Sequence, residues 1–482
     1  MKNGALKERV ARGAEWTLGE KIATALLQFV VRVLILRLLM PDDLAVLALL
    51  MAFASFALVI VDSGFSQMLV RKEDPTPTDY RSVFWFNIGV SLLLYGGLTA
   101  LSPLLAAYYE MPMLGEVAAV FFLMIPLNAL CVVQQTLLTR QFRFARLSQI
   151  VFLAQLGSGI GAVALAYMGL GVWALVAQQV LLMGFRALLL WVWGERIPRG
   201  KGSVQALRSM APYSLSLLAS DLVTALYNKV PQLFLGKLYP DAMLGYYDQA
   251  IKLKELPVQS AVQSMQQVTF PALARIADQQ DKFAESFRQV LMVTAYLLFP
   301  VMLGMSVVAE DLFAVLLGEQ WMPTVPLFEV ICLAGLFTPL AMMAYNVLKV
   351  KASGGLIMRL EVAKKGVMTL LLALSIPHSV EAVIWALVGS AAFDCVVNLA
   401  AALPLARLGW GRLLRTLMPI IGASVLMYEA VQWVAQLWAD PSWVRLLVQM
   451  ATGVVVYLGL SWLGQFEALR EILQLIRKQL KR

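Results

Sequence analysis

Long uninterrupted runs of apolar residues recur along the chain and restrict its possible folds more than any other feature. Fourteen windows are apolar over roughly the 20 residues that a helix needs to cross the hydrocarbon of a bilayer. They lie at 14–39, 44–65, 82–108, 116–138, 148–168, 172–193, 211–236, 245–270, 288–307, 324–346, 357–376, 381–403, 417–438 and 443–463. The runs do not alternate with a period of two, which favours spanning helices over the strands of a membrane barrel.

The composition excludes the main alternatives to a membrane protein. Sixty per cent of the residues are hydrophobic and 14% are charged, against about 45–50% and about 25% in soluble proteins. A soluble enzyme, a disordered chain and a secreted disulfide scaffold are therefore excluded, and an all-α polytopic membrane protein is predicted. Cys131, Cys332 and Cys395 lie singly in apolar runs, which predicts small core residues; neither a metal site nor a cofactor is expected.

The distribution of positive charge predicts the orientation in the membrane. Twenty-eight of the 39 Lys and Arg residues fall in alternate segments between the windows, and the intervening segments hold Lys237 alone. The positive-inside rule then places both termini in the cytoplasm. The net charge of +9 is explained by this face, so no nucleic-acid partner is needed. Beyond the last window, residues 464–482 are expected to form an amphipathic helix on the inner leaflet.

Polar residues repeat along one face of two apolar windows. Lys21, Gln28 and Arg32 share a face of the first window. The seventh window carries Asp221, Asn228 and Gln232, with Thr224, on one face at an offset of 200 residues. The turns that follow also match, with Leu39-Met40-Pro41-Asp42 against Leu238-Tyr239-Pro240-Asp241.

This repeat predicts two related six-helix lobes around a central cationic cavity, with two extra C-terminal helices. The predicted parts are an N-terminal lobe at 1–210, a C-terminal lobe at 211–415, an additional helix pair at 416–463 and a cytoplasmic tail at 464–482.

A third polar stripe lies on the eighth window. Lys252, Glu255, Gln259, Gln263 and Gln266 share one face over four helical turns. They would form either an interhelical hydrogen-bond seam or the wall of a water-filled lumen, and unpaired cations favour the lumen.

The other charged residues within the apolar windows have simpler interpretations. Arg37, Lys364, Lys365 and Arg445 lie near helix ends and are expected to snorkel to the interface. Asp394 and Asn398 are expected to pair with cations of the seventh or eighth helix. Arg186 fits a position in the lumen and a position at the inner interface equally well.

A cavity lined by cations and amides suits an anionic ligand that carries hydroxyl groups. Guanidinium and ammonium groups bind phosphate oxygens, while side-chain amides both donate to and accept from sugar hydroxyls. The predicted substrate-binding residues are Lys21, Gln28, Arg32, Asp221, Asn228, Lys229, Gln232, Lys252, Glu255, Gln259 and Gln263. Asp221 and Asp394 are candidates for ion coupling or, alternatively, for structural salt bridges.

Four stretches, in order along the chain, carry a family resemblance. They are Leu36-Arg37-Leu38-Leu39-Met40-Pro41-Asp42-Asp43, Asp62-Ser63-Gly64-Phe65-Ser66-Gln67-Met68-Leu69-Val70-Arg71, Gly245-Tyr246-Tyr247-Asp248-Gln249-Ala250 with Phe270-Pro271-Ala272-Leu273-Ala274-Arg275, and Leu316-Leu317-Gly318-Glu319-Gln320-Trp321. With them the chain resembles the polysaccharide-transporter branch (Wzx type) of the multidrug/oligosaccharidyl-lipid/polysaccharide flippase superfamily.

The resemblance implies a flippase in the bacterial inner membrane and no enzymatic chemistry. Its substrate would be an undecaprenyl-diphosphate-linked oligosaccharide, delivered for exopolysaccharide, capsule or O-antigen synthesis, with a polymerase and export machinery as further partners. By position, Arg32 best matches the functional arginines of relatives that flip the peptidoglycan precursor. The alternative is an ion-coupled multidrug-type antiporter of the same superfamily, for which carboxylates should dominate the cavity.

Overall fold

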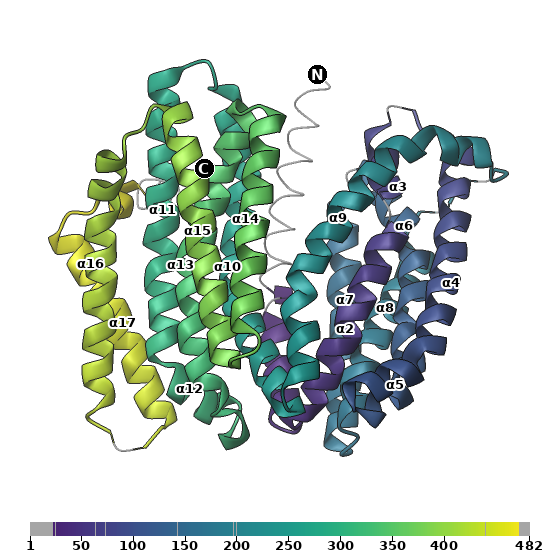
Figure 1. Cartoon of the computed structure of the whole chain (residues 1–482), viewed down its shortest axis with the longest axis horizontal. Coiled ribbons are helices and arrows are strands. Elements are labelled where there is room, and N and C mark those ends of the chain that lie inside the picture. The colour runs from purple at the N-terminus through teal and green to yellow at the C-terminus, as the bar shows by residue number, and fades with distance from the viewer. Residues whose placement is uncertain are drawn as a thin grey trace. The chain divides into compact units, whose positions relative to one another are not determined.

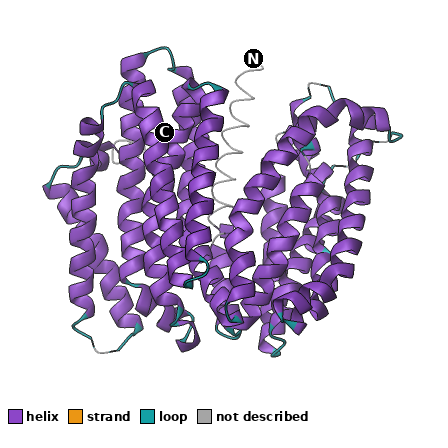
Figure 2. Cartoon of the chain, in the orientation of Figure 1, coloured by secondary structure: helices purple, strands orange, loops and turns teal. Residues whose placement is uncertain are grey.

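The structure is a computed structural model that describes residues 23–24, 26–62, 64–72, 74–141, 143–195, 197–198, 200–438 and 440–471. Helices joined by short loops make up this part of the chain, and it contains no strand (Figure 2). The chain divides into two compact units, Met1–Gly245 and Tyr246–Arg482, which we call the N-terminal unit and the C-terminal unit. The lobe boundary predicted at residue 210 stays a prediction.

The N-terminal unit packs eight labelled helices and a shorter one, Leu26–Leu36 (Figure 1). They are α2 (Pro41–Asp62), α3 (Phe65–Arg71), α4 (Pro77–Tyr109), α5 (Pro112–Phe122), α6 (Met124–Arg140), α7 (Phe144–Tyr167), α8 (Val172–Trp193) and α9 (Val204–Leu238). The first residues of α10 (Asp241–Arg275) also belong to this unit. Helix α2 contacts α4, α5, α6, α8 and α9, and 12 of its 22 residues are buried, so it is the central helix of the unit.

The C-terminal unit contains the rest of α10 and the following helices. They are α11 (Gln280–Val307), α12 (Ala309–Leu316), the 3₁₀ turn η1 (Glu319–Trp321), α13 (Thr324–Lys351), α14 (Gly354–Ser375), α15 (Val380–Ala406), α16 (Trp410–Ala435) and α17 (Trp443–Leu463). One apolar core joins α11, α13, α15, α16 and α17. Residues 308–323, between the apolar windows 288–307 and 324–346, are mostly helical, and Phe313 and Trp321 are fully buried there.

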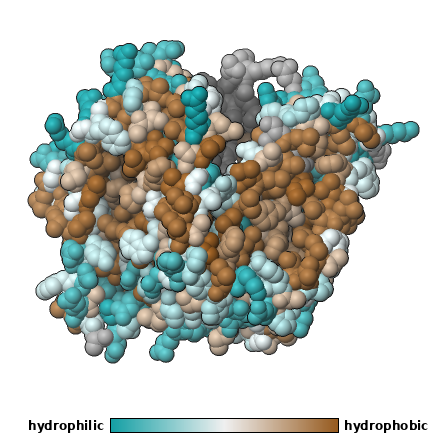
Figure 3. Space-filling view, viewed as in Figure 1, coloured by the Kyte–Doolittle hydropathy of each residue, from teal (hydrophilic) through white to brown (hydrophobic). Residues whose placement is uncertain are grey.

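Ten helical segments of the described chain are long and apolar enough to cross a membrane. Helices α9, α10 and α14 exceed the same length but are more polar, and α9 and α10 carry most of the predicted site residues. The total of fourteen spans and the symmetry of the lobes remain predictions. Within each unit, apolar side chains cover the middle of the outer surface and polar side chains gather toward the helix ends (Figure 3), as the hydrocarbon and interfaces of a bilayer require.

Local sequence explains where helices begin. The side chain of Thr76 accepts a hydrogen bond from the Asp79 amide at 3.2 Å, and the Thr76 amide donates to Asp79 Oδ2 at 2.7 Å, forming a capping box before Pro77. Ser353, Ser379 and Ser442 cap α14, α15 and α17, because each side chain accepts a hydrogen bond from the backbone amide three residues on.

Glycine permits two close approaches in the N-terminal unit. Gly64 has φ of 69°, and a Cβ atom there would lie 2.8 Å from the Ser214 carbonyl oxygen. Gly245 lies against Pro41, where an added Cβ would come within 2.1 Å of the carbonyl oxygen. Both sites lie in stretches that carry the family resemblance, so a packing requirement accounts for these glycines.

The tail is described as far as residue 471. Phe466 and Leu469 pack against the core of the C-terminal unit, and Ala468 is buried within it. In this part of the tail, the predicted apolar face therefore contacts protein.

Candidate functional site

Helix α9 presents a polar face in the N-terminal unit. Asp221, Thr224 and Asn228 are exposed, Lys229 is half-buried and Gln232 is buried. A carboxylate and an amide exposed near the middle of a 35-residue helix would be costly in lipid. We infer that this face of α9 contacts water or a polar ligand.

The helix Leu26–Leu36 places two further predicted residues in the same unit. The exposed Gln28 donates from Nε2 to Gln155 Oε1 on α7 at 3.3 Å. Arg32, one turn further on, is half-buried and has polar partners. Lys21 lies outside the described residues.

Sequence reasoning missed a polar cluster that three other helices build. Arg186 of α8 donates from Nη2 to Gln135 Oε1 on α6 at 2.9 Å. Asp62, at the exposed end of α2, is hydrogen-bonded to Asn128 of α6, and Arg186 and Asp221 are the charged groups that act on it. Among the described ion pairs, Arg186 has no carboxylate partner within 4.0 Å.

The sequence held only a weak signal for this cluster. Asp62 precedes Ser63-Gly64 and therefore suggests a turn, while Arg186 is an isolated cation in an apolar window. Only the packing of α2, α6 and α8 brings them together.

On α10, the structure corrects the prediction of an unpaired cation. Lys252 forms an ion pair with Asp248 at 2.6 Å, and the carboxylate of Asp248 is only 1% exposed. Gln259 Nε2 donates to Glu255 Oε2 at 3.1 Å. These are contacts within one helix at i, i+4, so the polar stripe partly satisfies itself. The side chain of Gln263 lies outside the described residues.

The snorkelling prediction is wrong for Lys364. Its ammonium group is 7% exposed and contacts Glu361 at 2.5 Å and Asn398 Oδ1 at 3.3 Å. Asn398 Nδ2 donates in turn to the Ala341 carbonyl oxygen at 3.1 Å. Asn398 therefore pairs with α14 instead of the predicted seventh or eighth helix, and the half-buried Asp394 lies near the charges of Lys364 and Lys365.

Arg445 is also buried and paired. Its Nη2 contacts Glu310 at 2.9 Å and its Nε contacts Asp311 at 3.0 Å. Both acids lie on α12, outside every apolar window, and more than 130 residues before Arg445 in the chain.

The charged side chains of the two units therefore differ in whether they can still bind a ligand. In the C-terminal unit, Lys252, Lys364 and Arg445 are neutralised by carboxylates. In the N-terminal unit, Arg186 is bonded to a neutral amide and the polar groups of α9 are exposed. The N-terminal groups can exchange water for an anionic or hydroxyl-bearing ligand, whereas the paired cations hold helices together.

The fold is similar to that of known membrane transporters. It resembles the Lipid II flippase MurJ in an inward closed conformation with a TM-score of 0.68, at 14% identity, over 91% of this chain and 98% of the flippase. An inward-facing multidrug resistance MATE family transporter of the MOP superfamily matches with a TM-score of 0.60, at 13% identity, over 81% and 94% of the two chains. The protein has the fold of the MOP superfamily.

The sequence comparisons identify the family. Residues 34–326 match the family described as "Polysaccharide biosynthesis protein", and the chain belongs to this family of membrane transporters. The succinoglycan biosynthesis transport protein ExoT of Rhizobium meliloti (strain 1021) is 25% identical over 331 residues, which are 68% of this chain and 67% of the relative. The resemblance inferred from the four sequence stretches is confirmed, and the protein is a transporter instead of an enzyme.

Proposed function

We propose that the protein flips undecaprenyl-diphosphate-linked polysaccharide repeat units from the cytoplasmic to the periplasmic leaflet of the inner membrane by alternating access. The family match and the flippase-like fold support a transporter of lipid-linked saccharides. The relative whose name states transport in succinoglycan biosynthesis supports the polysaccharide side of the proposal. The repeat unit would serve extracellular polysaccharide synthesis and pass to a polymerase and export machinery.

The exposed polar face of α9 is the observation that carries the proposal. Asp221 and Asn228 are open to solvent on a helix of spanning length, and Arg186 with its amide partner belongs to the same unit. A guanidinium group offers a planar fork to a diphosphate, and amides match sugar hydroxyls. Together with Arg32, we assign these groups to the ligand path.

Asp221 is the stronger of the two candidates for ion coupling. It is exposed, so a proton or cation could reach it. Asp394 is half-buried beside the charges of Lys364 and Lys365, and we assign it a structural role.

The test is export in a host that lacks its own copy of the gene. We expect Arg32→Ala and Arg186→Ala to reduce surface polysaccharide at least about tenfold, which corresponds to the loss of one charge-assisted contact of about 1.5–3 kcal/mol. Arg32→Lys should export an intermediate amount, because an ammonium group keeps the charge but loses the fork. The lipid-linked repeat unit should accumulate in the cytoplasmic leaflet.

Two controls make the result interpretable. Arg359→Ala and Lys282→Ala remove exposed cations of the C-terminal unit and should export normally, and immunoblots of membranes should show equal amounts of every variant. Lys252→Ala is a poorer probe because it leaves the buried Asp248 unpaired. Normal export by both arginine variants would refute the assignment of the path.

The multidrug-type antiporter remains the alternative, and the exposed carboxylates Asp62 and Asp221 favour it. An antiporter should extrude a cationic dye in an Asp221-dependent manner. Dye efflux with unchanged polysaccharide export would replace the flippase proposal.

The orientation can be tested with introduced cysteines. The native Cys131, Cys332 and Cys395 are buried, so a polar maleimide should leave them unlabelled. Glu319 and Lys201 are exposed, and Glu319→Cys should label from the periplasm while Lys201→Cys should label only after permeabilisation. The opposite pattern would invert the proposed topology.

A further inference from the structure

A pocket of about 540 Å³ lies within the C-terminal unit, apart from every residue assigned to the substrate path. The first turns of α11, the first turns of α16 and the segment that follows α17 form its walls. Its charged and hydroxyl side chains are Glu285, Arg288, Arg412, Arg415, Thr416 and Glu467. All three walls belong to segments whose cations predict a cytoplasmic position.

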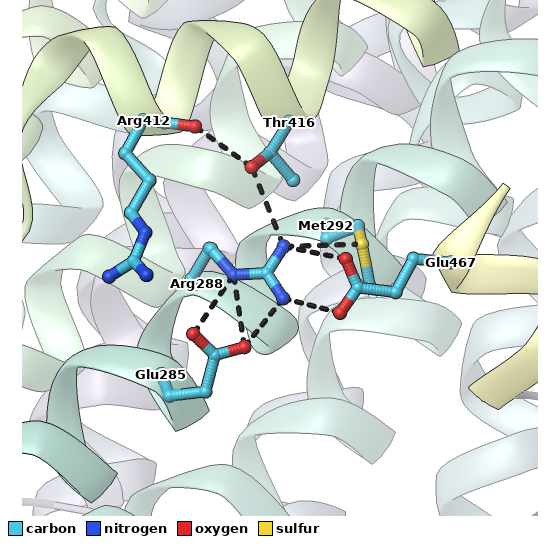
Figure 4. A network of polar contacts seen from close by, with 6 residues as sticks. All are labelled: Glu285, Arg288, Met292, Arg412, Thr416 and Glu467. Atoms are coloured by element: carbon cyan, nitrogen blue, oxygen red, sulfur yellow. Dashed lines mark hydrogen bonds and ion pairs between the residues drawn. The ribbon is translucent and has the colours of Figure 1, made fainter.

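One of the three arginines is fully occupied by protein partners (Figure 4). The Nε of Arg288 donates to Glu285 at 3.1 Å, and its Nη1 donates to Glu467 at 2.9 Å and to Thr416 at 3.5 Å. Its Nη2 bonds to both carboxylates. Glu285 and Glu467 therefore neutralise Arg288, and the contact with Glu467 connects the tail to α11. No N–H group of Arg288 is left to donate to a ligand.

The other two arginines keep their charge. Arg412 and Arg415 are three residues apart on α16, so they share a face, and both are exposed. No ion pair joins either guanidinium group to an acid in the described chain. The lining holds three arginines and two acids, so the pocket carries a net positive charge, and Arg412 also acts on the Glu285 carboxylate.

The surface beside these arginines is apolar. Met292, Pro419, Ile420 and Phe466 line the pocket next to them, and Pro419 is exposed. A ligand bound here would contact cations at one end and exposed hydrocarbon at the other. A lipid matches both features, whereas a soluble phosphate compound matches only the first.

We propose that this pocket binds the phosphate headgroup of an anionic membrane phospholipid, with Arg412 and Arg415 as its ligands. Basic pockets between spanning helices on the cytoplasmic side suit such headgroups, and the anionic inner leaflet supplies them. The acyl chains lie along the apolar lining of Met292, Pro419 and Phe466. The site is a second lipid-binding function, separate from translocation of the saccharide carrier.

The experiment is native mass spectrometry of the purified, delipidated full-length protein with added lipid. The probes are phosphatidylglycerol, phosphatidylcholine with the same acyl chains, and soluble glycerol phosphate as competitor. The wild type should retain phosphatidylglycerol in preference to phosphatidylcholine. Arg412→Gln with Arg415→Gln should weaken phosphatidylglycerol binding by about 25-fold, roughly fivefold for each arginine.

Matched variants distinguish the effect of the two pocket arginines from the effect of removing any two positive charges. Lys282→Gln with Arg359→Gln removes two exposed cations outside the pocket and should keep the preference. Arg412→Lys with Arg415→Lys should retain most of it, which also guards against misfolding of the glutamine variant. Equal loss in the control pair, or an unchanged preference in the Arg412/Arg415 pair, would overturn the site. Displacement of the lipid by stoichiometric glycerol phosphate would overturn the lipid as its occupant.

Discussion

The two units differ in how the charges within their helices are balanced by neighbouring groups. The C-terminal unit buries Lys364 and Arg445 and gives each at least one carboxylate. The N-terminal unit bonds Arg186 to an amide and leaves the carboxylate of Asp221 exposed. A buried cation must be neutralised locally, whereas a cation that meets water or ligand can keep its charge. The comparison separates structural cations from candidate binding cations, which residue type alone does not.

Breaking a buried pair in the C-terminal unit should have the largest effect on stability. Asp311 is 1% exposed, contacts Arg445 at 3.0 Å and accepts a hydrogen bond from the Ser442 amide. We expect Asp311→Ala to lower the free energy of unfolding by about 3 kcal/mol because it removes a partner of a buried charge. The measurement is the thermal unfolding midpoint in detergent. Glu310→Ala is the control; its carboxylate is 50% exposed and should contribute below about 1 kcal/mol, so equal losses would contradict the distinction.

Glu361→Gln should have an intermediate effect. Lys364 would keep Asn398 but lose the carboxylate, whose side chain is 35% exposed. We expect a loss of about 1.5 kcal/mol, typical of a hydrogen bond to a charged group near the interface of protein and solvent. The same unfolding assay applies, and an unchanged midpoint would show that Asn398 alone satisfies Lys364.

In the N-terminal unit, Arg186→Met should change stability by less than about 1 kcal/mol, because no close carboxylate is left unpaired. Export should nevertheless fall as it does for Arg186→Ala. A large loss of stability would place Arg186 with the structural cations and remove it from the proposed path.

The smallest effect is expected at an exposed pair. Lys237 Nζ donates to Glu110 at 2.8 Å, and this hydrogen bond lowers the pKa of the fully exposed Glu110 carboxyl. A lowered pKa in the folded state means that any stabilisation is present above the ordinary pKa and is lost as the pH falls. Glu110→Gln should therefore unfold close to the wild type at neutral pH, and the remaining difference should vanish in acid. A difference that grows in acid would contradict this sign.

Several features were predictable from residue type and spacing. The apolar runs predicted helices, and the Pro41 and Pro240 turns correctly marked where α2 and α10 begin. Cys131, Cys332 and Cys395 are buried as predicted. Four degenerate motifs in their order were enough to indicate the family, which the profile match at residues 34–326 confirmed.

The pairing of charges was not predictable. Lys364 was expected to reach the interface, but Glu361 and Asn398 hold it inside the unit. Asp62 and Arg186 are 124 positions apart in the numbering, so their spacing in the sequence did not indicate that the two charges lie near each other.

Hydrophobic periodicity and the positive-inside pattern are local properties, so the sequence alone determined that this chain is a helical membrane protein and which helices are polar, and its motifs indicated the transporter family. The acids that pair with Lys252 and Lys364 lie three or four residues away on the same helix. The partners of Arg445 on α12, and the second carboxylate of Arg288 at Glu467, depend on packing between segments far apart in the chain, so tertiary structure alone decided those pairings. It also decided that the exposed charges of Arg412 and Arg415 border a pocket, because an electrostatic role depends on distance in space and on burial.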